Sequence, residues 1–392
     1  MIILGKKVIS FCSNNYFGVI KRPEILNAAK KAIDLYGIGT CESRRLGGDL
    51  MLLETLERKI ADFKHGESAV IFSSGLMTNI SVIPSLSDFQ FYYQLFFNYP
   101  KSQSDRPTVI FSDICNHRSI QMGIKLSRGE LVTYEHCNVD DLEQKMILHK
   151  DKNMLIITDG VFSMDGDLAP LDKIAALAES HGALLMVDDA HGTGIYGATG
   201  RGTAEHFGVS DKVHINMGTF SKTFGGLGGF IVADSSIVKM IKYTSSGYYF
   251  TSSLPAEQAA GLIEAIDIVE REPELRKKLW ENVAKIIVGV KKIGLDIPDR
   301  WSHIIPIMVY DEHLAFKAEK YLLENGILCA SVQPPAVKSG QARLRITVNA
   351  SHTAEHISKL LVVLENMTRE LNIQVNPVSE NCILKKLGPL PG

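Results

Sequence analysis

The chain has 392 residues, of which 45% are hydrophobic and 22% are charged, and its formal net charge at pH 7 is −2. This length allows two substantial cores, and the near-neutral charge gives no general attraction to nucleic acid or to an anionic membrane. The six cysteines include no CxxC pair, so we expect reduced thiols in a cytoplasmic protein without a metal site. No apolar run approaches the roughly 20 residues of a membrane span, and residues 1–7 lack the order of a signal peptide.

Amphipathic helices are predicted over 23–35 and 50–64, where apolar residues recur at helical spacing. From about 67 to 250, short apolar runs alternate with helical patterns. This alternation indicates an α/β domain with a mostly parallel sheet that helices cover on both faces. The predicted strands are Ala69–Phe72, Thr108–Phe111, Leu155–Thr158, Ala183–Val187, His214–Met217 and Gly229–Val232.

The last third of the chain has the pattern of a smaller α+β domain. Helices are predicted after Pro255 and over 274–292, 313–325 and 353–371, with strands near Ile304–Val309 and Ala342–Val348. We expect four parts: an N-terminal segment, a large α/β domain, a small α+β domain and a poorly ordered tail that has three prolines. Their predicted ranges are 1–40, 41–285, 286–375 and 376–392.

The stretch from Gly218 to Gly226 places Lys222 among hydroxyls and glycines, directly after an apolar run. A lysine in such a turn can form a Schiff base with an aldehyde cofactor, while hydroxyls and backbone N–H groups hold a phosphate. A solvated loop is the alternative interpretation of the same residues.

Two carboxylates and a histidine follow the predicted strand that ends at Val187. Ligands of α/β sheets bind at the carboxyl ends of strands, and Lys222 lies 34 residues after Asp188, about one strand–helix–strand unit later. The two side chains would therefore face one crevice, as a pyridoxal phosphate (PLP) enzyme requires, with the acid keeping the pyridine nitrogen protonated. The alternatives are a helix N-cap for Asp188 and a hydrogen-bonded structural role for His191.

With these residues the chain resembles the α-oxoamine synthases, a family of fold-type I PLP enzymes. The resemblance runs from Ser13–Gly18 to about His352 and includes Phe72–Gly75, Asp159–Gly166 and Ala342–Thr347. It implies PLP as cofactor and a large domain with a seven-stranded, mostly parallel sheet. Glycine C-acetyltransferase, 8-amino-7-oxononanoate synthase and serine palmitoyltransferase share these motifs. Family members usually carry a longer N-terminal helix, which we expect to be absent here.

The resemblance also implies roles for single residues around the cofactor. Lys222 would carry the cofactor and move the proton at the substrate α-carbon, Asp188 would pair with the pyridinium nitrogen, and His117 would stack on the ring. His191 and Ser163 would lie near the phenolic oxygen. The phosphate would be held by Gly75, Leu76, Thr219 and Ser221 and, from the other subunit, by Thr251 and Ser252. That last contact implies a homodimer with active sites at its interface.

Arg345 is the candidate for binding the substrate carboxylate, since a guanidinium matches a carboxylate with two hydrogen bonds. Asn14 matches a residue that touches the same carboxylate, and a surface salt bridge is the alternative role of Arg345. The implied reaction is a decarboxylative condensation of serine, alanine or glycine with an acyl thioester of coenzyme A (CoA) or of a carrier protein. Its products are an α-amino ketone, carbon dioxide and a thiol, which makes the protein a PLP-dependent acyltransferase.

Some residues depart from the family pattern near the expected thioester site. Gln333, a candidate substrate-binding residue, stands before Pro334-Pro335, where many 8-amino-7-oxononanoate synthases have arginine. Leu53 replaces a common histidine and Asp49 a threonine. The acyl carrier is therefore expected to be unusual.

Two further stretches, Met217–Lys222 and Thr203–Gly208, resemble bacterial serine palmitoyltransferases, whereas His191–Gly194 is more similar to the 8-amino-7-oxononanoate synthases. We expect a medium- or long-chain acyl donor, as in serine palmitoyltransferase. 8-Amino-7-oxononanoate synthase and glycine C-acetyltransferase are the alternatives.

An aromatic stretch, Phe89–Pro100, belongs to an insertion relative to the family at about 85–107. It is predicted either to pack as a helix on its own or a neighbouring subunit, or to offer an apolar surface to a long acyl chain or a membrane.

Two other functions are open for the whole chain: a PLP aminotransferase or decarboxylase, and a non-catalytic synthase subunit. Retention of Lys222, Asp188 and His117 argues against the non-catalytic subunit.

Overall fold

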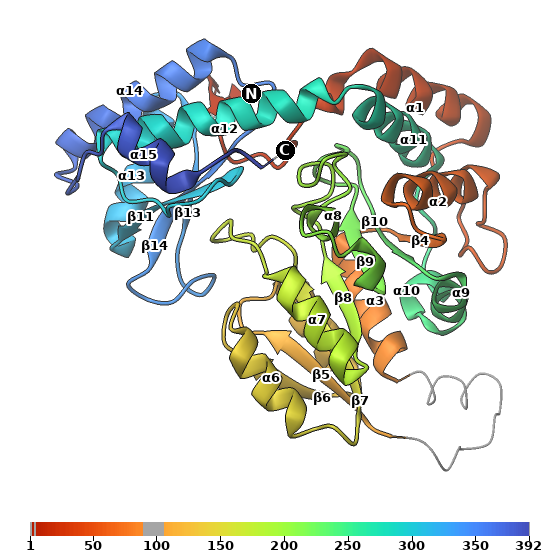
Figure 1. Cartoon of the computed structure of the whole chain (residues 1–392). Coiled ribbons are helices and arrows are strands. Elements are labelled where there is room, and N and C mark those ends of the chain that lie inside the picture. Colours follow the sequence, from red (N-terminus) through yellow and green to blue (C-terminus); the bar gives the residue numbers. More distant parts are fainter. Residues whose placement is uncertain (1, 4, 89–105, 392) are drawn as a thin grey trace. The chain divides into compact units, whose positions relative to one another are not determined.

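The computed structural model describes residues 2–3, 5–88 and 106–391, so the aromatic stretch at 89–100 lies outside the described residues (Figure 1). The chain divides into two compact units. The large unit comprises 19–162 and 168–272, and the small unit comprises 1–18, 163–167 and 273–392. Within the described ranges no helix has the length and apolar character needed to cross a membrane.

A seven-stranded sheet forms the centre of the large unit, which confirms the predicted fold class. Its strand order is β4-β10-β9-β8-β7-β5-β6, and all strands run parallel except β10, which is antiparallel to both neighbours. The strands are β4 (Ser68–Phe72), β5 (Thr108–Asp113), β6 (Glu130–Tyr134), β7 (Asn153–Asp159), β8 (Leu184–Asp188), β9 (Ile215–Thr219) and β10 (Gly229–Ala233). Only β6 was not predicted: it is an edge strand whose residues are mostly exposed, so it has no buried apolar run.

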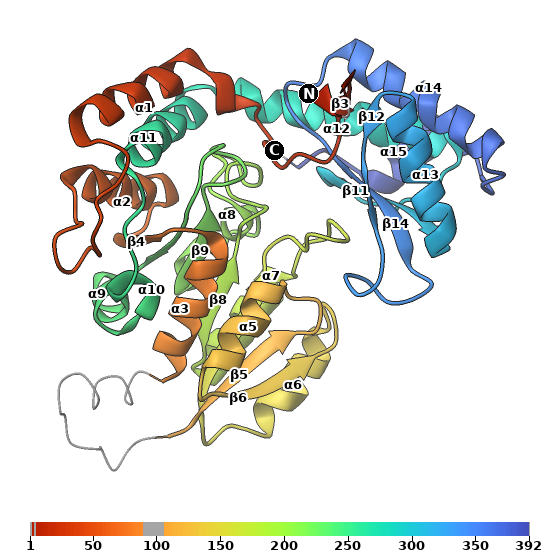
Figure 2. The same cartoon turned by 180° about the vertical axis from the view of Figure 1, so that it is seen from behind.

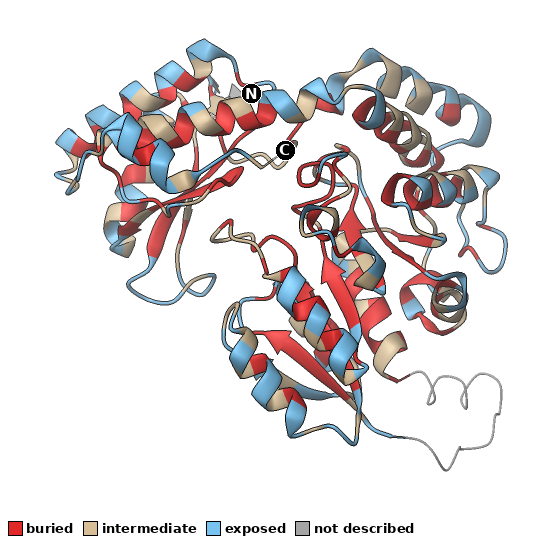
Figure 3. Cartoon of the chain, in the orientation of Figure 1, coloured by how far each residue is buried: buried red, intermediate tan, exposed pale blue. Residues whose placement is uncertain are grey.

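Helices cover both faces of this sheet (Figures 1 and 2). Successive strand residues point to opposite faces, so Val109 and Phe111 join one core and Ile110 the other. Figure 3 shows the strands buried between their helical layers. One face packs on α6 (Val139–Ile147) and α7 (Leu171–His181), and the other on α3 (Gly75–Ser87), α5 (Arg118–Leu126) and α9 (Ser235–Thr244).

A further helical layer of the large unit contains α1 (Pro23–Tyr36), α2 (Met51–Lys64) and α11 (Ala256–Arg271), with α1 and α2 both packing on α11. Short helices lie at α8 (Thr203–His206) and α10 (Ser246–Tyr249). The predicted helices over 23–35 and 50–64 are thus present.

The small unit has an antiparallel sheet of order β11-β14-β13 with helices packed around it. Its elements include β3 (Ile9–Ser10), β11 (Ile304–Tyr310), β12 (Ile327–Leu328), β13 (Ala330–Val332), β14 (Ala342–Thr347), α12 (Glu274–Ile293), α13 (Glu312–Glu324), α14 (Ala354–Glu370) and α15 (Glu380–Leu387). The expectation of a poorly ordered tail was wrong, because α15 lies within it. Ile383 is buried there, and Trp301 Nε1 donates a hydrogen bond of 3.0 Å to the Gly388 carbonyl.

Candidate active site

Lys222 lies in a turn directly after β9, at the carboxyl end of that strand. The Thr219 hydroxyl donates to the Gly228 carbonyl at 2.8 Å and accepts from the Ser221 amide at 3.2 Å. The Thr219 and Ser221 hydroxyl oxygens are 2.9 Å apart. Thr223 and Phe224, which follow the lysine, are buried. A solvated loop would have neither these bonds nor this burial, so the turn holds Lys222 at the edge of the sheet.

Asp188 is the last residue of β8 and is 4% exposed. Its carboxylate accepts hydrogen bonds from Asn79 Nδ2 at 2.8 Å and from the Ala190 amide at 3.1 Å. A turn, not a helix, follows it, so Asp188 is no helix N-cap. It is paired in register with Asp159 on β7 and with Met217 on β9, which places it among the carboxyl ends of the parallel strands.

His117 caps the N-terminus of α5 with its imidazole. Its Nδ1 accepts from the Ser119 amide at 3.3 Å and lies 2.7 Å from Ser119 Oγ. Because Asn79 Nδ2 already donates to that oxygen at 2.8 Å, the hydroxyl proton of Ser119 points to Nδ1. The proton of the neutral imidazole is then on Nε2. Burial lowers the pKa of His117, which favours this neutral form near pH 7.

Asp159, at the end of β7, supports the same network. Its Oδ2 accepts from the His117 amide at 2.8 Å, and its own amide donates to Asn116 Oδ1 at 2.9 Å. Burial and the nearby negative charge of Asp188 raise the pKa of Asp159 well above its usual range.

His191 is buried in the turn that follows Asp188. An ion pair between Lys64 and Asp189 secures this turn, with 3.0 Å between Nζ and Oδ2 and both side chains at most 2% exposed. The other oxygen of Asp189 accepts from the Thr203 hydroxyl at 2.7 Å. The ion pair therefore holds in place the backbone that carries Asp188 and His191.

The N-terminus of α3 adjoins the Thr219 hydroxyl. Ser74 caps this helix by accepting from the Met77 amide at 3.1 Å, while the amides of Gly75 and Leu76 belong to the first turn, which has no partners within the helix. A Cβ placed on Gly75 would lie 3.6 Å from Thr219 Oγ1. Amides of a helix start together with hydroxyls suit a phosphate dianion.

These donors fit PLP. An amine at a strand end can hold its aldehyde carbon, a buried carboxylate can face its pyridinium nitrogen, and the α3 terminus can hold its phosphate. The structure thus brings Lys222, Asp188, His117 and the phosphate residues into one unit. Thr251 is half-buried and Ser252 is exposed, and their contact with a second subunit stays a prediction.

The candidate residues for the substrate carboxylate lie together in the small unit. Arg345, on β14, is buried; its Nε donates to the Ser163 carbonyl at 2.5 Å and its Nη1 to the Thr347 hydroxyl at 2.9 Å. The Tyr16 hydroxyl, whose burial raises its pKa, interacts with Arg345 and donates to Asn14 Oδ1 at 3.4 Å. No carboxylate pairs with Arg345 among the described residues, so the surface salt bridge is not its role.

Two remaining predicted residues are also in the small unit. Ser163 was predicted to lie beside the phenolic oxygen of the cofactor, and this stays a prediction. In the structure the backbone carbonyl of Ser163 accepts a hydrogen bond from Arg345. Gln333 follows β13, where its amide donates to the Ser331 hydroxyl at 3.3 Å.

Asn79 and Ser119 were not predicted, although they connect Asp188 to His117. The sequence contains a pattern that could have indicated Asn79. This residue follows Gly75 by four positions, so both lie on one face of a helix whose next residues are largely apolar. A buried amide on that face must find partners, and Asp188 and Ser119 are those partners.

Comparison with known proteins agrees with this site. A model of the family described as aminotransferase class I and II matches residues 6–364. The 8-amino-7-oxononanoate synthase of Bacillus pumilus (strain SAFR-032) is 38% identical over 371 residues, which cover 94% of this chain and 90% of that protein.

Solved structures give the same result. A serine palmitoyltransferase from S. paucimobilis, with PLP and myriocin bound, has a TM-score of 0.88 and 30% identity and covers 95% of this chain and 90% of that chain. An 8-amino-7-oxononanoate synthase from Francisella tularensis has a TM-score of 0.75 and 26% identity, covering 93% and 99%. The predictions of PLP as cofactor and of an acyltransferase are confirmed. The chain belongs to the aminotransferase class I and II family and, within it, to the PLP-dependent α-oxoamine synthases.

Proposed function

We propose that this protein joins alanine to the thioester of a seven-carbon dicarboxylic acid and releases 8-amino-7-oxononanoate. The observation that carries this proposal is the 38% identity, over 94% of the chain, to a protein named for that product. In such a product, the carbon that bears the amino group and its methyl group match alanine without its carboxylate. The other seven carbons match the acyl group. The long-chain donor that we expected has less support from sequence relatives than this alternative.

The bond changes of the proposed reaction balance. The Cα–H and Cα–carboxylate bonds of alanine break, a bond forms between Cα and the acyl carbon, and the C–S bond breaks. Cα finally regains a proton. One thioester, one alanine and one proton thus give one amino ketone, one carbon dioxide and one thiol. When bound, PLP supplies the electron sink for carbanion character at Cα.

Residues of the large unit act on the cofactor side of the reaction. Lys222 would hold the cofactor aldehyde and, as a free amine, would take and return the proton at Cα. Asp188 would keep the pyridine nitrogen protonated. His117, whose lowered pKa favours the neutral imidazole, would face the cofactor ring with its Nδ1 engaged by Ser119.

Residues of the small unit act on the carboxylate of the amino acid. Arg345 binds it, and the bonds from its Nε and Nη1 to Ser163 and Thr347 set the direction of the guanidinium. Asn14 and Tyr16 complete this set. We also propose a homodimer in which Thr251 and Ser252 reach the phosphate of the partner's site.

A serine palmitoyltransferase-like activity is the second candidate. The TM-score of 0.88 to such an enzyme exceeds the 0.75 to the Francisella synthase. Gln333 also lacks the positive charge that would attract the free carboxylate of a dicarboxylic chain. This candidate predicts serine as the amino acid and a long monocarboxylic acyl group.

A matrix of substrates separates the two candidates. Glycine, alanine and serine are each combined with seven-carbon dicarboxylic and sixteen-carbon acyl-CoA, and thiol release is measured together with product mass. Carrier-protein thioesters form a second set of donors. Highest turnover with alanine and the dicarboxylic donor supports the main proposal, and highest turnover with serine and the long chain supports the second. Turnover of an amino acid without thiol release would refute both and indicate an aminotransferase or decarboxylase.

A further inference from the structure

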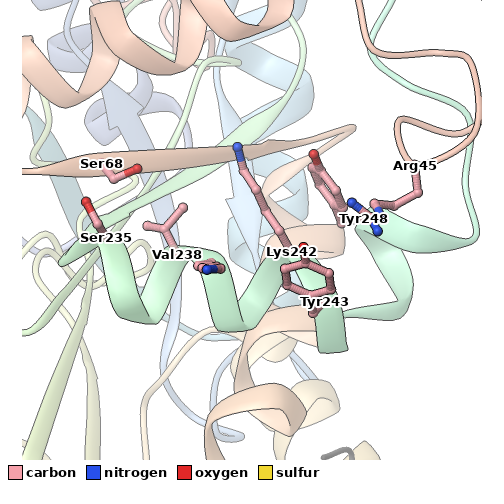
Figure 4. Close-up of a pocket in the computed structure, with 8 residues that line it drawn as sticks. Arg45, Ser68, Ser235, Val238, Lys242, Tyr243 and Tyr248 are labelled. Atoms are coloured by element: carbon pink, nitrogen blue, oxygen red, sulfur yellow. The ribbon is translucent and has the colours of Figure 1, made fainter. Parts of the chain in front are cut away.

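A separate pocket lies in the large unit beside the edge strand β4. Its volume is about 290 Å³. Figure 4 shows Ser68 on β4 near side chains of α9, with Arg45 and Tyr248 at one end. The residues that line it are Arg45, Ser68, Ser235, Val238, Lys239, Lys242, Tyr243 and Tyr248.

The pocket is rich in positive charge and in hydroxyl groups. Three of the lining residues are cations, four carry hydroxyls and one is a valine. None of them is acidic. All these polar groups can donate hydrogen bonds and the cations cannot accept any, so their natural partner is an anion with several acceptor oxygens.

Two carboxylates near the pocket, those of Glu57 and Glu67, are engaged with other groups. Glu57 binds Lys242 at 2.7 Å and the buried Arg44, and Glu67 accepts from the Ser235 amide at 2.8 Å. The charge of Lys242 is therefore partly balanced. Neither Arg45 nor Lys239 forms an ion pair with a carboxylate in the part of the chain that the structure describes.

Aromatic rings hold the cationic side chain at one end of the pocket. The guanidinium of Arg45 lies 4.8 Å from the centre of the Tyr243 ring and 5.6 Å from that of Tyr249. These contacts favour one position of the exposed Arg45 side chain.

This pocket lies at the other end of the strands from the candidate cofactor site. Gly229, the first residue of β10, is paired with Thr219, whereas Ala233, the last, is paired with Ser68. A five-residue strand spans about 15 Å. Ser68 and Ser235 are therefore separated by that length from Thr219, which was predicted to hold the cofactor phosphate.

We propose that this pocket binds the phosphate group of a small molecule, at a site separate from that of the cofactor. Two cations without a carboxylate partner among the described residues, together with the hydroxyls of Ser68, Ser235 and Tyr248, match the charge and the acceptor oxygens of a phosphate. A volume of about 290 Å³ holds a phosphate together with a small organic group. Two sources share this chemistry: free inorganic phosphate, and a nucleotide phosphate such as that at the 3′ position of CoA.

Calorimetric titration of the PLP-loaded enzyme tests the proposal, because bound PLP keeps its own phosphate site filled. The probes are inorganic phosphate and adenosine 3′,5′-bisphosphate, the nucleotide end of CoA. The test variant is Lys239→Glu, and the control is Lys125→Glu, an equal charge change at an exposed residue of the last turn of α5. We expect affinity to fall about tenfold or more in the test variant and to change less than about twofold in the control.

Comparison of the probes identifies the source. Tighter binding of the bisphosphate, lost in Lys239→Glu, supports a nucleotide ligand, and equal affinities support free phosphate or another phosphorylated molecule. Absence of binding by both probes, or an equal loss in the two variants, would overturn the proposal. These titrations need no substrate turnover, so their outcome is independent of the proposed condensation.

Discussion

Asn79 donates a hydrogen bond of 2.8 Å to the carboxylate of Asp188 from a fully buried position on α3. The same nitrogen donates to Ser119 Oγ at 2.8 Å, and Ser119 contacts His117. The side-chain amide of Asn79 therefore connects Asp188, proposed to face the pyridinium nitrogen, with His117, proposed to face the ring. The bond from Asn79 to Oδ2 also restricts the orientation of the Asp188 carboxylate.

Substitution Asn79→Ala removes both bonds and leaves the buried oxygen of Asp188 without this donor, at a cost of about 1–3 kcal/mol. We expect PLP affinity to fall about tenfold, measured by titration of the cofactor absorbance. The control is Asn138→Ala at the exposed N-cap of α6, which lowers stability by about 1 kcal/mol. Equal PLP affinities of the two variants would show that Asn79 does not position Asp188.

Substitution Lys222→Ala should remove the Schiff-base absorbance of bound PLP and lower thiol release by about 1000-fold or more. Absorbance spectra and a thiol assay measure the two effects. The control is Lys125→Ala, at an exposed lysine of the large unit. Turnover within tenfold of the unmodified protein would contradict the assigned role of Lys222.

Substitution Arg345→Lys tests carboxylate binding. A lysine cannot reproduce the two-pronged contact with a carboxylate, so we expect KM for the amino acid to rise about 10- to 100-fold. KM for the thioester should change little. The control is Arg369→Lys, whose side chain is 68% exposed. A rise confined to the thioester KM would assign Arg345 to the other substrate.

Substitution Lys64→Met leaves the charge of Asp189 buried without its partner. Breaking a buried pair in this way costs about 3–5 kcal/mol, measured by urea unfolding. The double variant with Asp189→Asn should recover part of that loss. Lys277→Met, at an exposed pair with Glu274, should cost less than about 1 kcal/mol. A similar small effect at Lys64 would mean that water reaches the pair.

Acid should destabilise the small unit through His352. Burial lowers its pKa in the folded state from 6.5 to about 4, and its Nδ1 accepts from the Asn349 amide at 3.2 Å. The folded state thus resists protonation of His352. The contribution of this residue to the free energy of unfolding is therefore complete above pH 6.5 and is lost as the pH falls to about 4. The full loss is about 3 kcal/mol.

Urea unfolding at pH 7 and pH 4 measures this dependence on acid. The His352→Gln variant, which cannot titrate, should lose less stability between the two pH values than the unmodified chain. His313→Gln, at an exposed residue, should retain the full dependence. If His352→Gln lost as much stability between pH 7 and pH 4 as the unmodified chain, the acid sensitivity would belong to other groups.

Local sequence patterns predicted most elements because each pattern reports burial along a short segment. The apolar run that ends at Asp188 and the one that precedes Lys222 both proved to be central strands. Strand β6 could not be predicted from such a pattern, since its residues are mostly exposed. The tail was judged by its prolines, although an amphipathic segment between them forms α15 with Ile383 buried.

Motifs and hydrophobic periodicity were enough to identify the family, the cofactor and the positions of Lys222 and Asp188 at strand ends, because both kinds of signal are local. The distant residues that support Lys222 and Asp188 became known only from the folded chain. Lys64 meets Asp189 across 125 positions, and Asn79 meets Asp188 across 109. Such pairs depend on how α2 and α3 pack around the sheet. No local pattern specifies that packing, since a buried polar side chain finds its partner only when whole elements come together.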